Sequence, residues 1–222
     1  MVPNKKLRSN RKILFESNAT FEEYQTELKH KLQNLRDNDD IPINSNAEEV
    51  DLWFSDTPGG VSFRGVSILY AVIRDRKPNH VVETGVRNGN SSLASLLALE
   101  ENGSGTLHSI DLPGGSVEPL NNEVGWIIPN RYKNDWDLRL GKSQELLPKL
   151  RTEIDEIDLF IHDSEHSHSC MMFEFELAWY WLSPDGVILS DDVNRNSAFK
   201  SFCKEKQAES GFIEQSFGFV IR

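Results

Sequence analysis

The sequence has few cysteines and no long hydrophobic segment. Only Cys170 and Cys203 occur among the 222 residues, which is too few for a disulfide framework and favours a reducing compartment. No stretch reaches the roughly 18 consecutive apolar residues that a membrane span requires. No apolar segment of a secretory signal follows the polar start MVPNKKLRSNRK. We therefore expect a soluble, cytoplasmic protein with no membrane span.

Basic residues are fewer than acidic ones, with 24 Lys and Arg against 35 Asp and Glu. The formal net charge is -11, and such an excess of acid repels the nucleic-acid backbone. The one basic cluster lies at the N-terminus, where a solvated, frayed end is its simplest explanation (Lys5, Lys6, Arg8, Arg11 and Lys12). The composition predicts that nucleic acid is not a partner.

The length of 222 residues suits one α/β domain with an N-terminal extension. Residues 1–50 are polar and are predicted to contain one helix, because apolar residues recur there at helical spacing (Phe21, Tyr24, Leu28, Leu32 and Leu35). The acidic, Asn-rich run from Asp37 to Asn46 is predicted to be a linker. Residues 51–222 would form the main domain.

The main domain alternates between apolar runs and helical stretches. A helix is predicted over residues 67–76, and four short apolar runs follow: HVVETG at 80–85, GTLHSID at 105–111, IDLFIHD at 157–163 and GVILSDD at 186–192. Each run leads into a turn and then a helix, which is typical of a parallel sheet with helices on both faces. The tail at 211–222 is predicted to add antiparallel strands around Gly218. The expected fold is a Rossmann-like, doubly wound, mostly parallel sheet with an antiparallel C-terminal strand.

One helix after residue 163 has a clear apolar face, formed by Met171, Phe175, Ala178 and Leu182. Pro184-Asp185-Gly186 is predicted to end it with turn chemistry.

A glycine-containing loop follows the first predicted strand. It reads Glu83-Thr84-Gly85-Val86-Arg87-Asn88-Gly89-Asn90-Ser91, and its two glycines permit a sharp turn and a close approach of the backbone to a ligand. The G-x-G-x-x-G pattern of dinucleotide enzymes is absent.

The observed E-x-G-x-x-x-G resembles motif I of class I S-adenosylmethionine-dependent methyltransferases. The resemblance implies that S-adenosyl-L-methionine is the cofactor and that the loop binds it through Glu83, Gly85, Arg87, Gly89 and Ser91.

Two later segments extend the predicted cofactor site. Asp111 ends the second predicted strand, where an acid is well placed for ribose hydroxyls. Ser143 and Gln144 belong to a Gly141-Lys142-Ser143-Gln144 segment that resembles the adenine-contacting G-x-S-Q of catechol O-methyltransferase-like enzymes. Ser143 is also expected to cap the helix that follows it.

Acidic and histidine side chains follow the last two predicted parallel strands. His162 to His168 reads HDSEHSH, and Asp191-Asp192 ends the next strand. Neighbouring carboxylates repel each other unless a cation neutralises them, and oxygen ligands favour Mg²⁺. The sequence therefore predicts a divalent cation at this edge.

The same residues sharpen the resemblance. Asp163, Asp191 and Asp192 fall where metal-dependent catechol O-methyltransferase-like enzymes place three metal ligands, and Asp163 would also contact the cofactor. His166 stands where that family has a general-base Lys, so the catalytic residues are predicted to be His166 and Asp163. The stretch DSEHSHS is also similar to a D-x-(D/E)-H-(S/A) pattern of a sugar and natural-product O-methyltransferase subgroup.

Several alternatives remain open at this stage. His162, His166, His168 and Cys170 could form a zinc site, and His162 could instead be a packed structural residue. Glu165 could join the metal shell or face solvent. His166 could act without metal on an acceptor that is already anionic, such as a uronic-acid carboxylate. A metal-dependent hydrolase and a non-catalytic binding module are the other classes.

The long segment between Asp111 and Gly141 is predicted to cover the acceptor site, with Trp126, Arg131 and Tyr132 as candidate pocket residues. We expect an S-adenosylmethionine-dependent O-methyltransferase, assisted by a divalent metal, that methylates a hydroxyl of a small polar acceptor such as a sugar or glycan unit. Whether it forms a homo-oligomer is left open.

Overall fold

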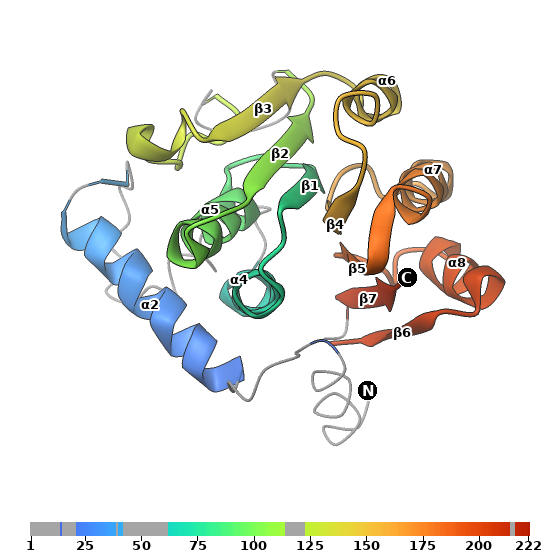
Figure 1. The fold of residues 1–222 in the computed structure, drawn as a ribbon, viewed down its shortest axis with the longest axis horizontal. Coiled ribbons are helices and arrows are strands. Elements are labelled where there is room, and N and C mark those ends of the chain that lie inside the picture. The colour runs from blue at the N-terminus through green and yellow to red at the C-terminus, as the bar shows by residue number, and fades with distance from the viewer. Residues whose placement is uncertain (1–13, 15–20, 39, 42–61, 114–122, 214–215) are drawn as a thin grey trace.

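The fold is built on a seven-stranded sheet. The computed structural model describes residues 14, 21–38, 40–41, 62–113, 123–213 and 216–222. The strand order is β3-β2-β1-β4-β5-β7-β6, as Figure 1 shows. The strands are β1 (His80–Thr84), β2 (Thr106–Asp111), β3 (Trp136–Leu140), β4 (Ile157–His162), β5 (Leu182–Ser190), β6 (Glu209–Phe212) and β7 (Gly218–Ile221).

The direction of the strands confirms the predicted fold class. Strands β1 to β5 are parallel, and β7 runs antiparallel to both β5 and β6. The chain order reverses between β1 and β4, which is the switch point where open α/β sheets bind their ligands.

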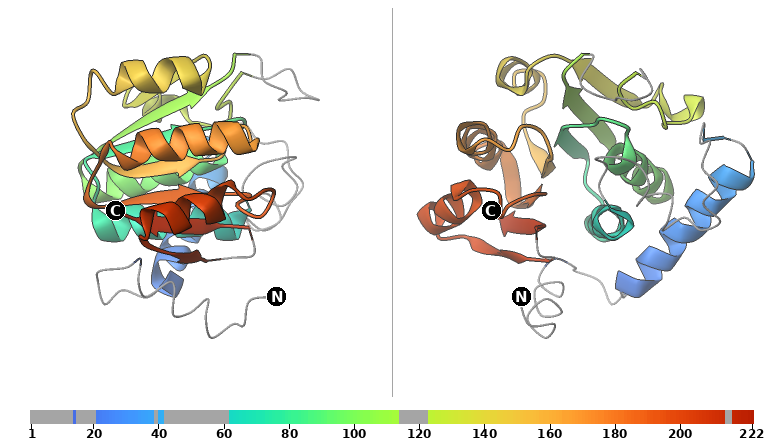
Figure 2. Two further views of the ribbon diagram at one scale, coloured as in Figure 1. Left: turned by 90° about the vertical axis from the view of Figure 1, so that its right-hand side faces the viewer. Right: turned by 180° about the vertical axis from the view of Figure 1, so that it is seen from behind.

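Helices cover both faces of the sheet, as the views in Figure 2 show. One face carries α2 (Phe21–Asp37), α4 (Phe63–Arg76) and α5 (Asn90–Asn102). The other face carries α6 (Ser143–Leu150), α7 (His168–Trp179) and α8 (Ala198–Lys206). A short 3-10 turn, η1 (Asn130–Tyr132), precedes β3.

The alternation of side chains along each strand divides the interior into two cores. On β1, Val81 packs into the core under α4 and α5, whereas Val82 packs into the core under α7 and α8. Both valines are fully buried, as expected for a parallel strand covered on both faces.

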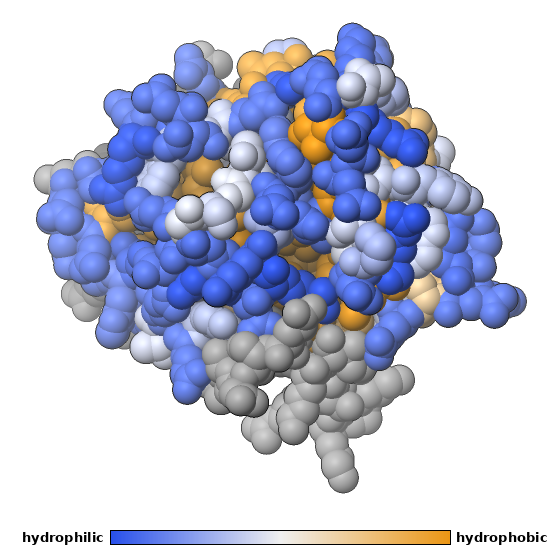
Figure 3. All heavy atoms as spheres, viewed as in Figure 1, coloured by the Kyte–Doolittle hydropathy of each residue, from blue (hydrophilic) through white to orange (hydrophobic). Residues whose placement is uncertain are grey.

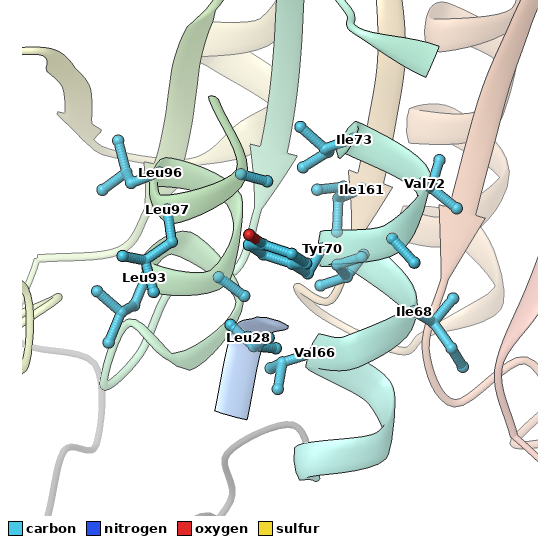
Figure 4. Close-up of a cluster of buried hydrophobic side chains, with 14 of the residues drawn as sticks. Leu28, Val66, Ile68, Tyr70, Val72, Ile73, Leu93, Leu96, Leu97 and Ile161 are labelled. Atoms are coloured by element: carbon cyan, nitrogen blue, oxygen red, sulfur yellow. The ribbon is translucent and has the colours of Figure 1, made fainter. Parts of the chain in front are cut away.

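Helix α2 belongs to the first core. Figure 4 shows Leu28 of α2 beside Tyr70 and Val66 of α4, and Leu28 and Leu32 are fully buried. The Tyr70 hydroxyl donates a hydrogen bond to Glu27 Oε1 of α2 at 2.8 Å. The predicted helix is therefore present and packs on α4 and α5. The predicted linker lies mostly outside the described residues, and the division at residue 50 stays a prediction.

Two predicted element boundaries and one predicted loop differ from the structure. Helix α4 begins at Phe63 because Ser62 caps it, its hydroxyl accepting from the Gly65 amide at 3.2 Å. Helix α7 ends at Trp179, and Leu182 starts β5 by pairing with Ile157. The expected helical face therefore ends at Ala178, and Pro184-Asp185-Gly186 lies inside β5.

Strand β3 lies in the segment that was predicted to be a covering loop. Its pairing with β2 joins Leu107 to Trp136 and Asp111 to Leu140, so tertiary pairing gives this half-buried edge segment its structure.

The face of the molecule seen in Figure 3 is mostly hydrophilic, with smaller hydrophobic areas between the polar side chains. Leu112 is 49% exposed, Leu140 is 52% exposed, and both follow or end a strand at the same edge of the sheet. Among the described residues, no helix is both long enough and apolar enough to cross a membrane.

Candidate active site

Backbone hydrogen bonds join the carboxyl ends of β1, β2, β4 and β5. The amide of Gly85 donates to Ile110 O at 2.9 Å, that of Asp163 to Thr84 O at 2.8 Å, and that of Asp191 to His162 O at 3.0 Å. The residues that follow these four strands therefore lie side by side, which is the arrangement that the predicted site required.

A cavity of about 900 Å³ opens at this edge. Nine predicted site residues line it: Gly85, Arg87, Asp111, Ser143, Gln144, Asp163, His166, Asp191 and Asp192. Glu83, Gly89 and Ser91 do not line it; they are buried in or behind the glycine loop.

Gly85 is required by the close approach of two strand ends. Its φ is +86°, and a Cβ there would lie 2.1 Å from the carbonyl oxygen of Asp163. Any other residue would separate the ends of β1 and β4. Gly89 (φ +102°) precedes α5, and a Cβ there would lie 3.1 Å from Gly125 Cα, so this glycine allows the 123–128 segment to pack on the loop.

Glu83 lies behind the loop and connects three elements. Ser92 of α5 and Ser109 of β2 donate hydrogen bonds to Glu83 Oε2 at 2.6 and 2.8 Å, and Trp136 Nε1 donates to Ser109 Oγ at 2.8 Å. Burial raises the pKa of Glu83 above its usual range. These contacts describe a residue that supports the loop from inside the protein.

Asp111 holds the glycine loop through its carboxylate. Oδ2 accepts from the amides of Val86 at 2.9 Å and Arg87 at 2.6 Å, and Oδ1 accepts from the amide of Leu112 at 2.7 Å. A carboxylate offers about four acceptor positions, so a position remains for a ligand hydroxyl. The predicted ribose contact stays a prediction.

The start of α6 differs from the expectation for Ser143. Lys142 occupies the cap position and makes no side-chain capping bond, while Ser143 is the first helical residue. The predicted capping role of Ser143 is therefore wrong, although its side chain lines the cavity. Gln144 Nε2 donates to Cys170 Sγ of α7 at 3.3 Å, which joins this wall to α7.

The acidic side chains converge as predicted. Burial, reinforced by Asp191, Glu83 and Asp192, raises the pKa of Asp163 well above its usual range. Burial also raises the pKa of Asp191. Negative charge is therefore disfavoured at these two carboxylates, and a positively charged ligand in the cavity would stabilise it.

His166 faces two of these carboxylates. Its Nε2 lies 3.7 Å from Asp163 Oδ1 and 3.9 Å from Asp192 Oδ2, and this buried nitrogen has no hydrogen-bond partner among the described residues. Burial and the neighbouring His162 lower the pKa of His166, so the ring favours its neutral form. The Asn196 side-chain amide donates to the His166 carbonyl at 2.9 Å and holds its backbone.

Two of the three predicted metal ligands have protein partners in the structure. Asp192 Oδ2 is paired with Arg195 Nε at 2.7 Å, and Asp191 Oδ1 accepts from the amide of Asp192 and the Ser216 hydroxyl. In the described part of the chain, no three His, Cys, Asp or Glu side chains are grouped so that they could hold a metal ion. The structure therefore does not show the predicted divalent cation or the alternative zinc site, and the metal role of Asp163, Asp191 and Asp192 stays a prediction.

The side chains predicted to cover the acceptor make other contacts. Trp126 Nε1 donates to Asn88 Oδ1 at 3.0 Å, Arg131 pairs with Asp40 at 3.0 Å, and the Tyr132 hydroxyl donates to Glu100 at 2.8 Å. From this segment, Val124 lines the cavity. The three predicted residues fasten the segment to the protein.

The sequence prediction missed Glu174. This fully buried acid of α7 accepts hydrogen bonds from Thr84, His162 and Ser164. The available signal was its position: Glu174 stands three residues after Met171 and four before Ala178, on the apolar face of the helix.

The comparisons with known proteins define the class. Residues 82–193, just over half of the chain, match a family described as a methyltransferase domain. The chain therefore belongs to this methyltransferase family. The predicted enzyme class, a methyltransferase, is confirmed.

Two solved structures share the fold. The O-methyltransferase from Bacillus cereus in complex with SAH is 16% identical, with a TM-score of 0.51 over 78% of this chain and 86% of that chain. The SAH-bound methyltransferase PaMTH1 of Podospora anserina is 17% identical, with a TM-score of 0.58 over 80% of this chain and 89% of that chain. No curated protein matches the sequence.

Proposed function

We propose that the chain is an O-methyltransferase that uses S-adenosyl-L-methionine to methylate a hydroxyl of a small polar acceptor, such as a sugar or glycan unit. The observation that carries the proposal is the position of His166 Nε2 at the cavity, between Asp163 and Asp192. The solved O-methyltransferase structure of the same fold supports the transfer to oxygen.

The residues fit the methyl donor by charge and space. The cavity wall contains the acids Asp111, Asp163 and Asp191, and the donor carries a positive sulfonium that such acids would stabilise. When bound, the donor supplies an electrophilic methyl group. Gly85, Asp111, Ser143 and Gln144 form the wall against which it would lie.

His166 is proposed as the general base. A neutral hydroxyl is a poor nucleophile, so a group at the site must accept its proton as the new oxygen–carbon bond forms and the sulfur–carbon bond breaks. Nε2 of His166 would take that proton, and Asp163 and Asp192 would stabilise the resulting imidazolium. The products would be a methyl ether, S-adenosylhomocysteine and a proton on His166.

The divalent cation, the sugar acceptor and a homo-oligomer remain predictions. Arg195 already offers a positive charge to Asp192, and the proposed chemistry therefore routes no step through a metal.

A turnover screen tests the function. The purified chain is incubated with S-adenosylmethionine and a panel of sugars, glycans, phenols and a uronic acid, and S-adenosylhomocysteine release is measured with magnesium and with chelator. We expect turnover of a sugar hydroxyl and donor binding at micromolar Kd by calorimetry. Loss of turnover in chelator would restore the metal to the mechanism, and absence of donor binding would contradict the proposal.

His166→Asn separates binding from chemistry. The amide retains polarity but cannot act as the base, so kcat is expected to fall by about 10²–10⁴-fold, the usual contribution of general-base catalysis. Donor Kd should change little. An unchanged kcat would remove His166 from the proton transfer.

A further inference from the structure

Glu174 is an acidic side chain of α7 with no exposed surface, and it lies beside the core under α7 and α8. Its Oε2 accepts hydrogen bonds from Thr84 Oγ1 and His162 Nδ1, both at 2.6 Å. Its Oε1 accepts from Ser164 Oγ at 2.8 Å and from Cys170 Sγ at 3.5 Å. A single carboxylate of α7 therefore contacts β1, β4, the segment after β4 and its own helix.

The hydrogen-bond donors around the carboxylate favour its ionised form. Burial alone would raise its pKa, but the hydrogen bonds from His162, Ser143 and Thr84 outweigh burial, so the pKa of Glu174 lies below its usual range. An ionised carboxylate only accepts hydrogen bonds, and this requires the proton of the His162 ring to be on Nδ1.

The two residues held by Oε2 are the ends of neighbouring strands. Thr84 and His162 are register partners and are the last residues of β1 and β4. The next residues are Gly85 and Asp163, which approach too closely for any Cβ at Gly85. Through Oε2, Glu174 therefore fixes the separation of the strand ends that form the centre of the cavity.

The other carboxylate oxygen, Oε1, accepts hydrogen bonds from two residues of the cavity wall. Ser164 lies between Asp163 and His166 in sequence, and both Ser164 and Cys170 line the cavity. The Cys170 sulfur also accepts from Gln144 Nε2 of α6 at 3.3 Å. Charge-assisted hydrogen bonds are roughly twice as strong as neutral ones, so the buried charge fastens this segment more firmly than a neutral group would.

We propose that Glu174 is a positioning residue that holds the 163–166 segment against the end of β1, so that Asp163 and His166 keep their place relative to the methyl donor. This inference rests on the proposed function and adds to it a residue that contacts neither donor nor acceptor. The reason is geometric, because small displacements of a base can cost large factors in rate.

Three variants of the full chain test the proposal: Glu174→Gln, Ser164→Ala and the matched control Glu176→Gln. Glu176 lies on the same helix and pairs with Lys206 at 2.6 Å, away from the cavity. Glu174→Gln and Ser164→Ala are expected to lower kcat about tenfold or more, with the calorimetric Kd of S-adenosylmethionine within about threefold of wild type. The control is expected to retain wild-type kcat.

Amide hydrogen exchange over residues 163–167 supplies a readout that needs neither donor nor acceptor. Both test variants should exchange faster there, and the control should not. Thr84→Val should behave as the test variants do, because it deletes one hydroxyl donor at similar volume, whereas Thr84→Ser keeps the donor and should restore slow exchange.

The outcomes are distinct. The proposal would be overturned if both test variants had the same amide exchange and the same kcat as Glu176→Gln. It would also be overturned if the test variants lost donor affinity by the same factor as kcat. If Glu174→Gln does not fold, Ser164→Ala and the Thr84 pair decide. A wild-type chain that fails to bind the donor would contradict the proposed function, while the exchange result would still stand for Glu174.

Discussion

Asp163 and Asp191 place carboxyl groups in a part of the cavity wall that disfavours their negative charge. The pKa values of both are raised, first by burial, so their ionised forms are less favourable in the folded protein than in the unfolded chain. Groups kept in such a state are typical of functional sites. The sequence predicted these two residues because each directly follows an apolar strand, whereas Glu174 escaped because it reaches the strand ends only through the packing of α7.

Asp191→Asn should therefore stabilise the fold while lowering activity. The asparagine side chain carries no charge, but its oxygen can still accept the hydrogen bonds from the Asp192 amide and the Ser216 hydroxyl. At pH 7 the unfolding free energy should rise by about 0.5–2 kcal/mol, as is common when strain at a functional site is relieved.

The sign of the pH dependence follows from the raised pKa. As pH falls through the folded-state pKa, wild-type Asp191 becomes neutral, so the advantage of the variant should shrink towards zero. Urea denaturation at pH 7 and at acid pH measures both values. The exposed Asp155→Asn is the control and should change neither; a variant no more stable than wild type at pH 7 would contradict the argument.

The sequence prediction was correct for elements with one dominant periodicity. It was wrong for segments whose structure depends on pairing with a neighbouring strand. The apolar residues of α2 recur at helical spacing, and the helix is present at Phe21–Asp37. Strand β3 reads WDLRL, in which apolar and polar residues alternate as in a half-buried strand. The prediction missed this signal because the segment is short and lies within a long stretch of turns, and the pairing with β2 shows the strand. Leu182 fits the helical spacing of α7, yet Pro184 and the pairing with Ile157 place it in β5.

Leu32→Ala tests whether α2 is part of the main core. Leu32 is fully buried in the cluster that α2 shares with α4 and α5, so the truncation should cost about 2–5 kcal/mol of unfolding free energy. Denaturant unfolding followed by circular dichroism gives the value. His30→Ala, on the exposed side of the same helix, should stay within about 0.5 kcal/mol of wild type. A cost below about 1 kcal/mol for Leu32→Ala would mean that α2 contributes little to the core.

The whole molecule carries its charge in a way that suits a cationic ligand. The net charge is -11, and acidic side chains line the cavity at the carboxyl ends of the strands. The alternation of strands and helices in the sequence was sufficient to predict that these acids meet at one edge of the sheet. The identity of the acceptor was not predictable, because the side chains of the 123–132 segment turn to Asn88, Asp40 and Glu100 through contacts that sequence spacing does not encode.

A rise in ionic strength should weaken the binding of the donor more than the binding of the product. S-adenosylmethionine carries one more positive charge than S-adenosylhomocysteine, and the Debye length falls from about 10 Å at 0.1 M to about 3 Å at 1 M salt. Over this range the donor Kd should rise about three- to tenfold, and the product Kd less than about twofold. Calorimetry at both salt concentrations measures the difference. Equal changes of the two Kd values would argue against electrostatic attraction of the donor. Asp163→Asn should reduce the difference between the salt dependence of the donor Kd and that of the product Kd.

The reversed direction of β7 decides where the chain leaves the sheet. Gly218 pairs with Ser190 at the cavity edge, Ile221 pairs with Val187, and the Arg222 amide donates to Gly186 O at 3.0 Å. The chain from Gly218 to Arg222 therefore runs away from the mouth of the cavity. A fluorophore, affinity handle or surface tether attached after Arg222 would emerge on the remote side, leaving the entry of acceptor and donor unobstructed.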